Sequence, residues 1–417
     1  MDEDTFVVVD GALVDLLLQS NNKYAKFVHI TASGKKLVFL KLDKALYGTV
    51  RAARLFYENI SGKLSEYGFV ANPYDACVMN KIIDGKQCTV VWHVDDLKLS
   101  HVDSKVVDDV LTYLSSIYGE LSITRGNHHT YVGMEFIFPG DGTVEVDMSS
   151  YLHEAVNEFP EVLDRIVTSP ASNFIFDIDP DCPKLDEEKR EMLHHLVAKL
   201  LFVSTRARPD IHLPISFLTS RVTKADEDDW KKLKRLLLYI KNTIDLRLTL
   251  SASDMNIIKW WVDAAYGVRE DCKSQTGSTM TLGRGTIMSK STKQKLNMKS
   301  STEEELVSAS DCVPQIVWTN YFILAQGYGI NNTILYQDNT SVILMETNGK
   351  LSSSKRTKHI NICYFFIQDR VKNGEITLKY CPTDQMLADY FTKPLQGAKF
   401  ILFRDMILGI SKIDFTR

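Results

Sequence analysis

The chain has 417 residues, of which 44% are apolar and 24% are charged, and its net charge at pH 7 is −4. These values are typical of a globular protein of two or three domains and do not favour a nucleic-acid partner for the chain as a whole. No apolar run approaches the roughly 18 residues of a membrane span, so no membrane association is expected.

Targeting signals and cysteine spacing point to an intracellular protein. The first residues, Met-Asp-Glu-Asp, have no basic region of the kind that begins a signal peptide. The seven cysteines are scattered and include no Cys-x-x-Cys pair, which indicates reduced thiols and excludes a structural zinc. Charge is uneven along the chain, because residues 256–400 carry more Lys and Arg than Asp and Glu whereas the remainder is acidic. A basic C-terminal part is compatible with phosphate binding.

The first 150 residues combine strands with a few helices. Apolar periodicity predicts two helices, at residues 51–67 and 106–117. Alternating or short apolar runs predict strands at residues 6–9, 37–42, 89–94, 97–99, 131–138 and 143–148.

Asp95 and Asp96 are the most informative residues of this first part. They lie between the two short strands at 89–94 and 97–99, so they fall at a tight hairpin turn. Adjacent carboxylates repel each other, and a divalent cation would offset the repulsion. A solvated Asp-Asp turn is the alternative interpretation of this segment taken alone.

Residues 151–255 are predicted to be largely helical. Three prolines and an acidic cluster at 168–190 indicate a loop or linker, and helices follow at 191–204 and 230–241. The second helix places several basic residues on one face, which either follows a nucleic-acid backbone or is simply solvated. These residues are Lys231, Lys232, Lys234, Arg235 and Lys241.

A new unit is predicted from residue 256 to residue 400, followed by a C-terminal tail at 401–417. Strands are expected at 257–262, 278–282, 286–289, 334–337 and 376–380, with helices at 302–326 and 356–373. Strands that come first and then alternate with helices predict a mixed sheet flanked by helices.

Four acidic residues occupy strand ends and helix starts of this unit: Asp263, Glu305, Asp338 and Asp389. Carboxylates at such positions of one sheet can converge, and a cluster of four would repel itself without cations. It fits two metal ions roughly 3.5–4 Å apart, which together activate water and stabilise the leaving oxygen in phosphodiester hydrolysis. Taken singly each acid has another explanation. Glu303 and Glu304 beside Glu305 look like helix N-terminal charges, Asp338 fits an Asx-turn or a helix N-cap, and Asp389 fits a solvated helix face.

Motifs in order along the chain resemble the C-terminal part of the Pol polyprotein of copia-type LTR retrotransposons, which is reverse transcriptase followed by RNase H. The resemblance extends from about residue 30 to residue 397. It rests on Lys-Ala-Leu-Tyr-Gly (44–48), His-Val-Asp-Asp (93–96), Tyr-Val-Gly-Met (131–134), Arg-Pro-Asp-Ile (208–211), Ser-Ser-Thr-Glu-Glu-Glu (300–305), Gln-Asp-Asn (337–339), Arg-Thr-Lys-His-Ile (356–360) and Leu-Ala-Asp-Tyr-Phe-Thr-Lys (387–393).

The resemblance implies a multidomain α/β and α+β fold. Residues 1–150 would form a partial reverse-transcriptase palm that lacks the N-terminal fingers. Residues 151–255, which include the linker 168–190, would form a helical thumb and connection. Residues 256–400 would form an RNase H-like mixed sheet with flanking helices.

The resemblance also implies the chemistry. Asp263, Glu305, Asp338 and Asp389 would be the metal-binding catalytic acids of RNase H, and Asp95 and Asp96 the paired acids of the polymerase. Each site would use two Mg²⁺ (or Mn²⁺) ions. The partners would be an RNA·DNA hybrid and a primer-template, with a dNTP in the intact polymerase. A cytoplasmic virus-like particle or the nucleus would be the location.

Two basic clusters are candidate contacts for the nucleic-acid backbone, with a solvated loop as the alternative. The first lies between two of the catalytic acids and the second in the Arg-Thr-Lys-His motif. Their members are Lys290, Lys293, Lys295 and Lys299, and Arg356, Lys358 and His359.

One departure from the family pattern leaves the polymerase in doubt. Polymerases of this kind need a further upstream aspartate, and the residues around Asp10 superficially resemble those that surround this aspartate in the family. The run at residues 6–9 matches instead the strand that follows that aspartate, so we expect the polymerase site to be incomplete here. A polymerase that uses Asp10, and a catalytically inactive nucleic-acid-binding remnant of a decayed element, are the alternatives.

Overall fold

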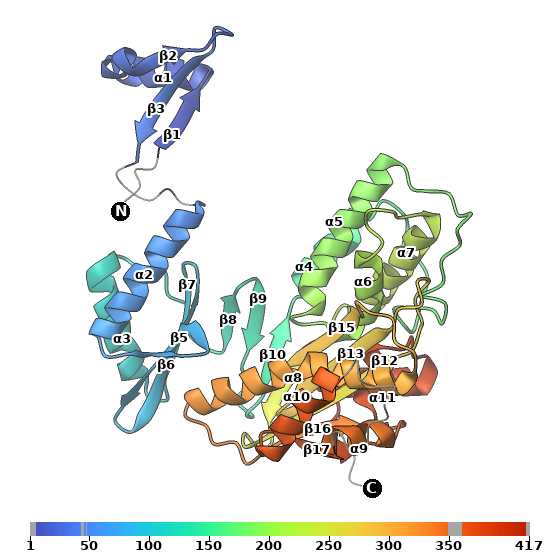
Figure 1. The fold of residues 1–417 in the computed structure, drawn as a ribbon. Coiled ribbons are helices and arrows are strands. Elements are labelled where there is room, and N and C mark those ends of the chain that lie inside the picture. Colours follow the sequence, from blue (N-terminus) through green and yellow to red (C-terminus); the bar gives the residue numbers. More distant parts are fainter. Residues whose placement is uncertain (1–5, 43–45, 47, 349–360, 414–417) are drawn as a thin grey trace. The chain divides into compact units, whose positions relative to one another are not determined.

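The computed structural model describes residues 6–42, 46, 48–348 and 361–413. The chain divides into two compact units, residues 1–71 with 76–107 and residues 72–75 with 108–417. Figure 1 shows the elements of both units. Within the described ranges no helix is long and apolar enough to span a bilayer.

The first unit begins with a small antiparallel sheet and one helix. Its strand order is β1-β3-β2, and Val8 of β1 lies opposite Phe39 of β3. Gly11 takes a positive φ of 57° between β1 and the following helix α1, a conformation that suits glycine. The elements are β1 (Phe6–Asp10), α1 (Ala12–Ser20), the 3₁₀ helix η1 (Asn22–Phe27), β2 (Val28–Ile30) and β3 (Lys36–Lys41).

A long helix and an antiparallel sheet in the order β4-β5-β6-β7 follow. Alternate residues of β6 are buried, among them Val90 and Trp92, and Tyr57 of α2 stacks on Trp92 at a centroid distance of 6.2 Å. The elements are α2 (Val50–Glu66), β4 (Val70–Asn72), β5 (Asp75–Ile83), β6 (Lys86–His93), β7 (Asp96–Ser100) and then α3 (Ser104–Tyr118).

The second unit contains an antiparallel sheet in the order β14-β11-β10-β9-β8. The prediction of one strand at residues 131–138 is wrong, because the chain reverses at Val132 and Gly133, both with positive φ, to form the β8–β9 hairpin. The strands are β8 (His128–Tyr131), β9 (Met134–Ile137), β10 (Val144–Asp147), β11 (Leu248–Ala252) and β14 (Gly283–Arg284).

Four helices of this unit pack around one apolar core. Helix α7 begins with a capping box in which Asp226 and Asp229 each accept from the other's backbone N–H, and it buries Trp230, Leu233 and Leu237. The elements are α4 (Ser149–Glu158), α5 (Glu187–Ser204), the 3₁₀ helix η2 (Pro209–Ile211), α6 (His212–Thr219) and α7 (Glu227–Asn242).

A five-stranded mixed sheet forms the rest of the unit. Its order is β15-β13-β12-β16-β17; the first three strands pair antiparallel, and β12-β16 and β16-β17 pair parallel. In chain order this is 3-2-1-4-5, and the fold is a mixed α/β sheet of the RNase H-like kind with flanking helices. The strands are β12 (Ile257–Ala265), β13 (Gln275–Thr281), β15 (Met288–Lys293), β16 (Asn332–Gln337) and β17 (Thr377–Tyr380).

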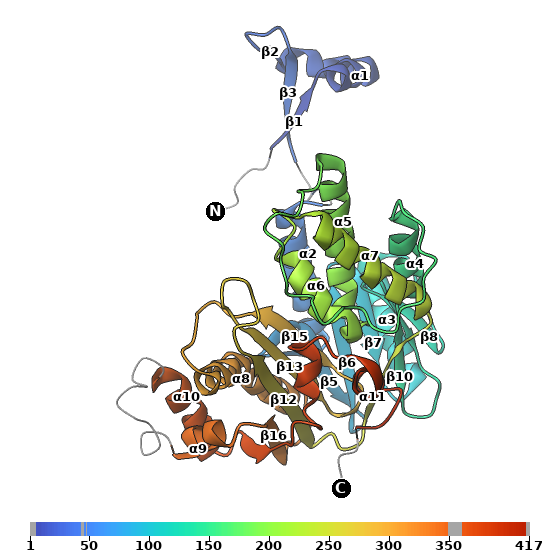
Figure 2. The same ribbon diagram turned by 90° about the vertical axis from the view of Figure 1, so that its right-hand side faces the viewer.

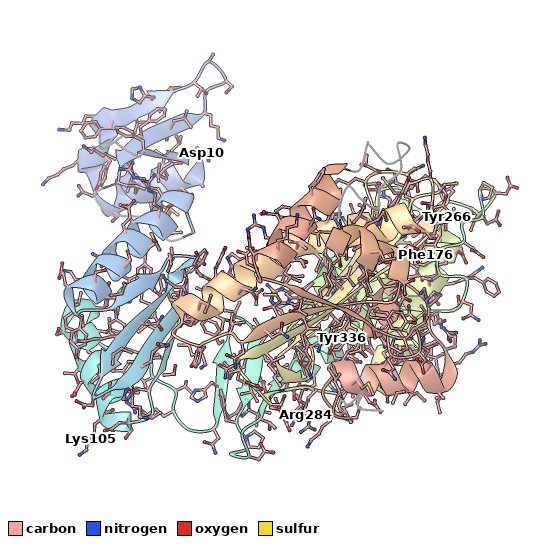
Figure 3. All side chains as sticks on the ribbon, turned by 60° about the horizontal axis from the view of Figure 1, so that its bottom comes forward. Asp10, Lys105, Phe176, Tyr266, Arg284 and Tyr336 are labelled. Carbon is pink, nitrogen blue, oxygen red and sulfur yellow. The ribbon has the colours of Figure 1, made fainter. Side chains whose placement is uncertain are left out.

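The two faces of this sheet are covered by different elements. Trp260 of β12 belongs to a core shared with α8, whereas the neighbouring Trp261 belongs to the core of the α4–α7 helices. In Figure 2, α8 and α11 lie on opposite sides of β12 and β13, and Figure 3 labels Tyr336 of β16, which stacks on Trp261. The helices are α8 (Ser301–Ala325), α9 (Thr340–Asn348), α10 (Asn361–Lys372), the 3₁₀ helix η5 (Leu387–Phe391) and α11 (Gly397–Ile407).

The predicted tail at 401–417 contains part of a helix. Phe400, Phe403 and Ile407 of α11 recur at helical spacing, and all three are buried in the same core as α5, α6 and α7. This core therefore draws residues from both sides of the predicted boundary at 255. The predicted division into domains remains a prediction.

Candidate metal centre

Asp263 lies near the end of β12 and faces a short helix that crosses the sheet. Its register partner on β13 is Gly277. A Cβ atom at Gly277 would come within 2.6 Å of Thr392 Cγ2 and 2.8 Å of the Ala388 carbonyl oxygen. Only glycine leaves room for η5 at this point, and the close approach lets the Thr392 hydroxyl donate to Asp263 Oδ2. The sequence contains no obvious signal for this role of Gly277.

Glu305 is placed by the start of α8. Ser300 caps the helix by accepting from the Glu303 backbone N–H at 3.3 Å, and Glu303 accepts from the Lys299 N–H at 3.0 Å. One turn later Glu305 faces the sheet and is 7% exposed. Glu303 and Glu304 lie in the first turn of α8, as predicted, and both side chains are buried, that of Glu304 completely.

Asp338 follows β16, the parallel neighbour of β12. One carboxylate oxygen from each of Asp263, Glu305 and Asp338 lies within 4.8 Å of the others, and these three form the one group of potential metal ligands found within the described residues. Thr383 donates to Asp338 Oδ2 at 3.1 Å and orients it.

Asp389, the fourth predicted acid, lies on η5 and is held by two lysines. Lys393 Nζ is 2.5 Å from Asp389 Oδ1 and 3.4 Å from Asp263 Oδ2. Lys399 Nζ is 2.9 Å from Asp389 Oδ2. The structure therefore groups three of the four predicted acids directly and links the fourth to Asp263 through Lys393.

Burial shapes the charge of this cluster. Desolvation raises the pKa of Asp263 to about 7 against the attraction of Lys393, and it raises the pKa of Glu305 well above its ordinary value, with the carboxylates of Asp263 and Asp338 adding to the effect. Burial disfavours the Lys393 ammonium, but Asp263 and Asp389 outweigh it and raise the lysine's pKa.

The donor set suits a hard divalent cation. Glu305 Oε2 is buried and has no hydrogen-bond partner within the described part of the chain, and such an unpaired acceptor is unfavourable unless a cation or a proton satisfies it. Carboxylate oxygens are the ligands that Mg²⁺ and Mn²⁺ prefer. The residues present thus fit the predicted metal.

Asp95 and Asp96 lie where the hairpin was predicted. The turn between β6 and β7 consists of Val94 and Asp95, with His93 opposite Asp96, and both aspartates are exposed. Val94 has a φ of 56°, which is unusual for a β-branched residue and marks a strained turn. No third potential ligand joins the two aspartates in a metal-binding group among the residues that the structure describes.

Asp10, the alternative third acid, ends β1. It pairs with Lys35 at 2.6 Å, and both side chains are about half exposed. Figure 3 labels Asp10 on this small sheet.

The first basic cluster partly faces solvent. Lys290 and Lys293 lie on β15, and Lys293 pairs with Asp271 at 2.6 Å. Lys295 and Lys299 are exposed on the segment that leads to α8. Several motif residues lie outside the described residues, namely Lys44, Ala45, Tyr47, Arg356, Lys358 and His359.

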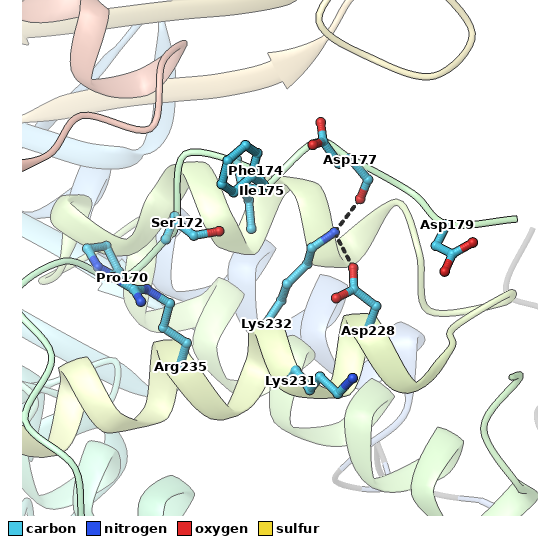
Figure 4. Close-up of a pocket in the computed structure, with 11 residues that line it drawn as sticks. Pro170, Ser172, Phe174, Ile175, Asp177, Asp179, Asp228, Lys231, Lys232 and Arg235 are labelled. Carbon is cyan, nitrogen blue, oxygen red and sulfur yellow. Dashed lines mark hydrogen bonds and ion pairs between the residues drawn. The ribbon is translucent and has the colours of Figure 1, made fainter. Parts of the chain in front are cut away.

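The basic face of α7 is largely engaged within the protein. Lys232 donates to the Asp177 carbonyl at 2.5 Å and pairs with Asp228 at 2.9 Å, beside a cavity of about 480 Å³ (Figure 4). Lys234 pairs with Glu161, and Arg235 donates to Ser169. These contacts favour a structural role for this face over a nucleic-acid contact.

Known proteins resemble this chain over most of its length. Residues 25–170 match the family model described as reverse transcriptase (RNA-dependent DNA polymerase). The retrovirus-related Pol polyprotein from transposon TNT 1-94 of Nicotiana tabacum is 24% identical over 382 residues, which is 90% of this chain. That from transposon RE1 of Arabidopsis thaliana is 26% identical over 89% of this chain.

Along most of its length the chain resembles the Pol polyproteins of copia-type transposons. It spans 28% of the length of the tobacco Pol polyprotein and 25% of the Arabidopsis one. A solved protease-reverse transcriptase of prototype foamy virus is similar at 14% identity and a TM-score of 0.24, covering 91% of this chain and 43% of that one. At that score the likeness carries no argument.

Sequence reasoning missed the two lysines of the site. Lys393 follows Asp389 by four residues within the Leu-Ala-Asp-Tyr-Phe-Thr-Lys motif, so the motif already contained this lysine. Lys399 lies on the next helix, and only the fold brings it to Asp389.

Proposed function

We propose that the carboxylate cluster is a metal-dependent RNase H centre that hydrolyses the RNA strand of RNA·DNA hybrids. The observation that carries the proposal is the group of Asp263, Glu305 and Asp338, three carboxylates from three elements of an RNase H-like sheet, with one buried oxygen lacking a partner. Structural ion pairs do not explain such a group, since among the described residues none of the three pairs with an Arg and only Asp263 pairs with a lysine.

The residues that would hold Mg²⁺ or Mn²⁺ are Asp263, Glu305 and Asp338, and Asp389 is the candidate ligand for a second ion. Bound divalent ions supply a deprotonated water and stabilise the leaving oxygen in phosphodiester hydrolysis. Thr392 and Thr383 orient Asp263 and Asp338 by donating hydrogen bonds to them. Lys290, Lys293, Lys295 and Lys299 would contact the hybrid backbone next to the cluster, as would Arg356, Lys358 and His359.

Cleavage of a labelled RNA strand in a hybrid, measured in Mg²⁺, tests this proposal. Asp263→Asn should lower the rate by at least about 10³-fold, because an amide cannot replace the charge of a central metal ligand. Asp254→Asn is the matched control, since Asp254 is exposed and its side chain caps a turn that Asn also caps. Undiminished cleavage by Asp263→Asn would place the active site elsewhere.

For the polymerase part we infer that Asp95 and Asp96 supply two carboxylates of a nucleotidyl-transfer site for primer-template and dNTP. The reverse transcriptase match at 25–170 covers both residues. Primer extension on a poly-rA template that is lost in Asp10→Ala would show that a complete site uses Asp10. Absence of extension by folded protein that cleaves hybrids would support an incomplete site.

The alternative of an inactive remnant makes a different prediction, namely hybrid binding with no turnover by the unaltered protein. The expected setting is intracellular, in a virus-like particle or in the nucleus. No disulfide joins the cysteines among the described residues, which is compatible with a reducing compartment.

A further inference from the structure

Lys393 occupies the space between two carboxylates of the proposed centre. Its Nζ lies 2.5 Å from Asp389 Oδ1 and 3.4 Å from Asp263 Oδ2, and the Thr392 hydroxyl next to it in the chain donates to Asp263. Lys399 takes the other oxygen of Asp389 at 2.9 Å. Both oxygens of Asp389 are therefore bound to ammonium groups.

An ion that bridged Asp263 and Asp389 would compete with this lysine for the same place. Mg²⁺ binds carboxylate oxygens at about 2.0–2.1 Å. Because the Lys393 ammonium already contacts both of these oxygens, an ion bound to them would lie close to it, and the two cations would repel each other. Lys393 and a second ion therefore compete for these two carboxylates.

The other three carboxylates are left for one ion. Asp263, Glu305 and Asp338 offer oxygens within 4.8 Å of one another, and Glu305 Oε2 has no hydrogen-bond partner among the described residues.

We propose that Lys393 acts as a built-in substitute for the second metal ion: the protein without nucleic acid binds one divalent ion, at Asp263, Glu305 and Asp338, and a second ion binds only when Lys393 leaves Asp263 and Asp389. The lysine can leave because its side chain is 40% exposed on a flexible stem, and a phosphate of the bound strand offers the ammonium a new partner. The inference rests on the proposed function and makes Lys393 a positioning residue for metal loading.

Calorimetric titration with Mn²⁺, checked by electron paramagnetic resonance of free Mn²⁺, tests this on the full chain without nucleic acid. The unaltered protein should bind one ion. Lys393→Met should bind two, with the affinity for the second raised at least about tenfold. Lys393→Arg, which keeps the charge, should remain at one.

Lys224→Met is the matched control. Lys224 is exposed and has no ion pair among the described residues, and its substitution removes the same charge. It should leave the count at one. Two ions in the unaltered protein, or one ion in folded Lys393→Met, would overturn the proposal. If Lys393→Met does not fold, the titration of the unaltered protein and of Lys393→Gln still decides it.

The outcome is separable from that of the proposed function. One bound ion with no hybrid cleavage would contradict the nuclease but not the role of Lys393. Two bound ions with full cleavage would contradict the role of Lys393 alone.

Discussion

Glu346 shows how a single residue can tie stability to pH. Its side chain on α9 is fully buried, and neither carboxylate oxygen has a hydrogen-bond partner among the residues that the structure describes. Desolvation raises its pKa from 4.5 to about 8. Between these pH values the folded protein keeps Glu346 protonated whereas the unfolded chain ionises it. The contribution of Glu346 to the free energy of unfolding is therefore fully present below about pH 4.5 and is lost as the pH rises toward 8.

We expect Glu346→Gln to remove this dependence. Between pH 5 and pH 8 the free energy of unfolding of the unaltered protein should fall relative to the variant by a total on the order of 4 kcal/mol. Urea unfolding at several pH values measures the difference. Glu120→Gln, at an exposed position without an ion pair, should show no such change. Parallel pH profiles for Glu346→Gln and the unaltered protein would show that Glu346 is ionised in the fold.

At the residue scale the sequence predicted the acids better than their surroundings. Asp263, Glu305 and Asp338 were identifiable by their places at strand ends and a helix start, and the fold brings them together. Glu304 was predicted to be a helix N-terminal charge and does lie in the first turn of α8, but its side chain is buried and burial raises its pKa to about 7. Side-chain burial depends on packing from distant segments, which local periodicity does not contain.

At the scale of elements, η5 is positioned by contacts from several parts of the chain. Tyr390 donates to the Asp210 carbonyl at 3.3 Å, and the Phe391 carbonyl accepts from Ser291 at 2.6 Å. Asp210 itself forms a buried pair with Arg208, with two hydrogen bonds of 2.8 Å. The Arg-Pro-Asp-Ile motif therefore helps to hold the helix that carries Asp389.

Gly277→Ala should displace η5. The added Cβ would lie within 3 Å of Thr392 Cγ2, the Ala388 carbonyl oxygen and Phe391 Cβ. The last two atoms cannot move without a shift of the backbone. We expect a loss of roughly 2 kcal/mol or more in unfolding free energy and a drop in hybrid cleavage, from overpacking and a shifted Asp389. Urea unfolding and the cleavage assay measure the two effects.

Gly62→Ala is the matched control. Gly62 lies inside α2 with nothing within 4 Å of an added Cβ, so alanine should stabilise by about 1 kcal/mol. Equal effects of the two substitutions would contradict the close approach at Gly277.

Element prediction succeeded where apolar periodicity was strong and failed at turns. The helices α2, α5, α7 and α8 and the strand β12 were predicted close to their observed bounds. The β8–β9 hairpin was missed because its turn uses Val132, a residue that rarely takes positive φ. Helix α6 was missed because it is buried on nearly all sides and so has no polar stripe.

At the scale of the whole molecule, one core connects segments that are distant in sequence. It joins Leu200 of α5 and Leu237 of α7 to Trp261 of β12 and to Phe403 of α11. The sequence alone predicted a boundary near 255, because composition and motifs change there. Neither composition nor motif order contains information on the long-range packing that joins the two sides.

A fragment of residues 256–400 should therefore fail to fold, because it lacks α5–α7 and most of α11. Residues 108–417, which hold the whole core, should unfold cooperatively. Circular dichroism melts of both fragments at equal concentration compare them. A cooperative melt of the 256–400 fragment would show that the RNase H-like sheet is independent of the helical region.

The most direct test of the central claim is the strand-specific cleavage of an RNA·DNA hybrid by Glu305→Gln and by the unaltered protein, each with Mg²⁺ and with a chelator. The account predicts that only the RNA strand is cut, that the chelator abolishes cutting, and that Glu305→Gln is slower by at least about 10³-fold while still folded. Cleavage that survives the chelator, or a variant as fast as the unaltered protein, would contradict it.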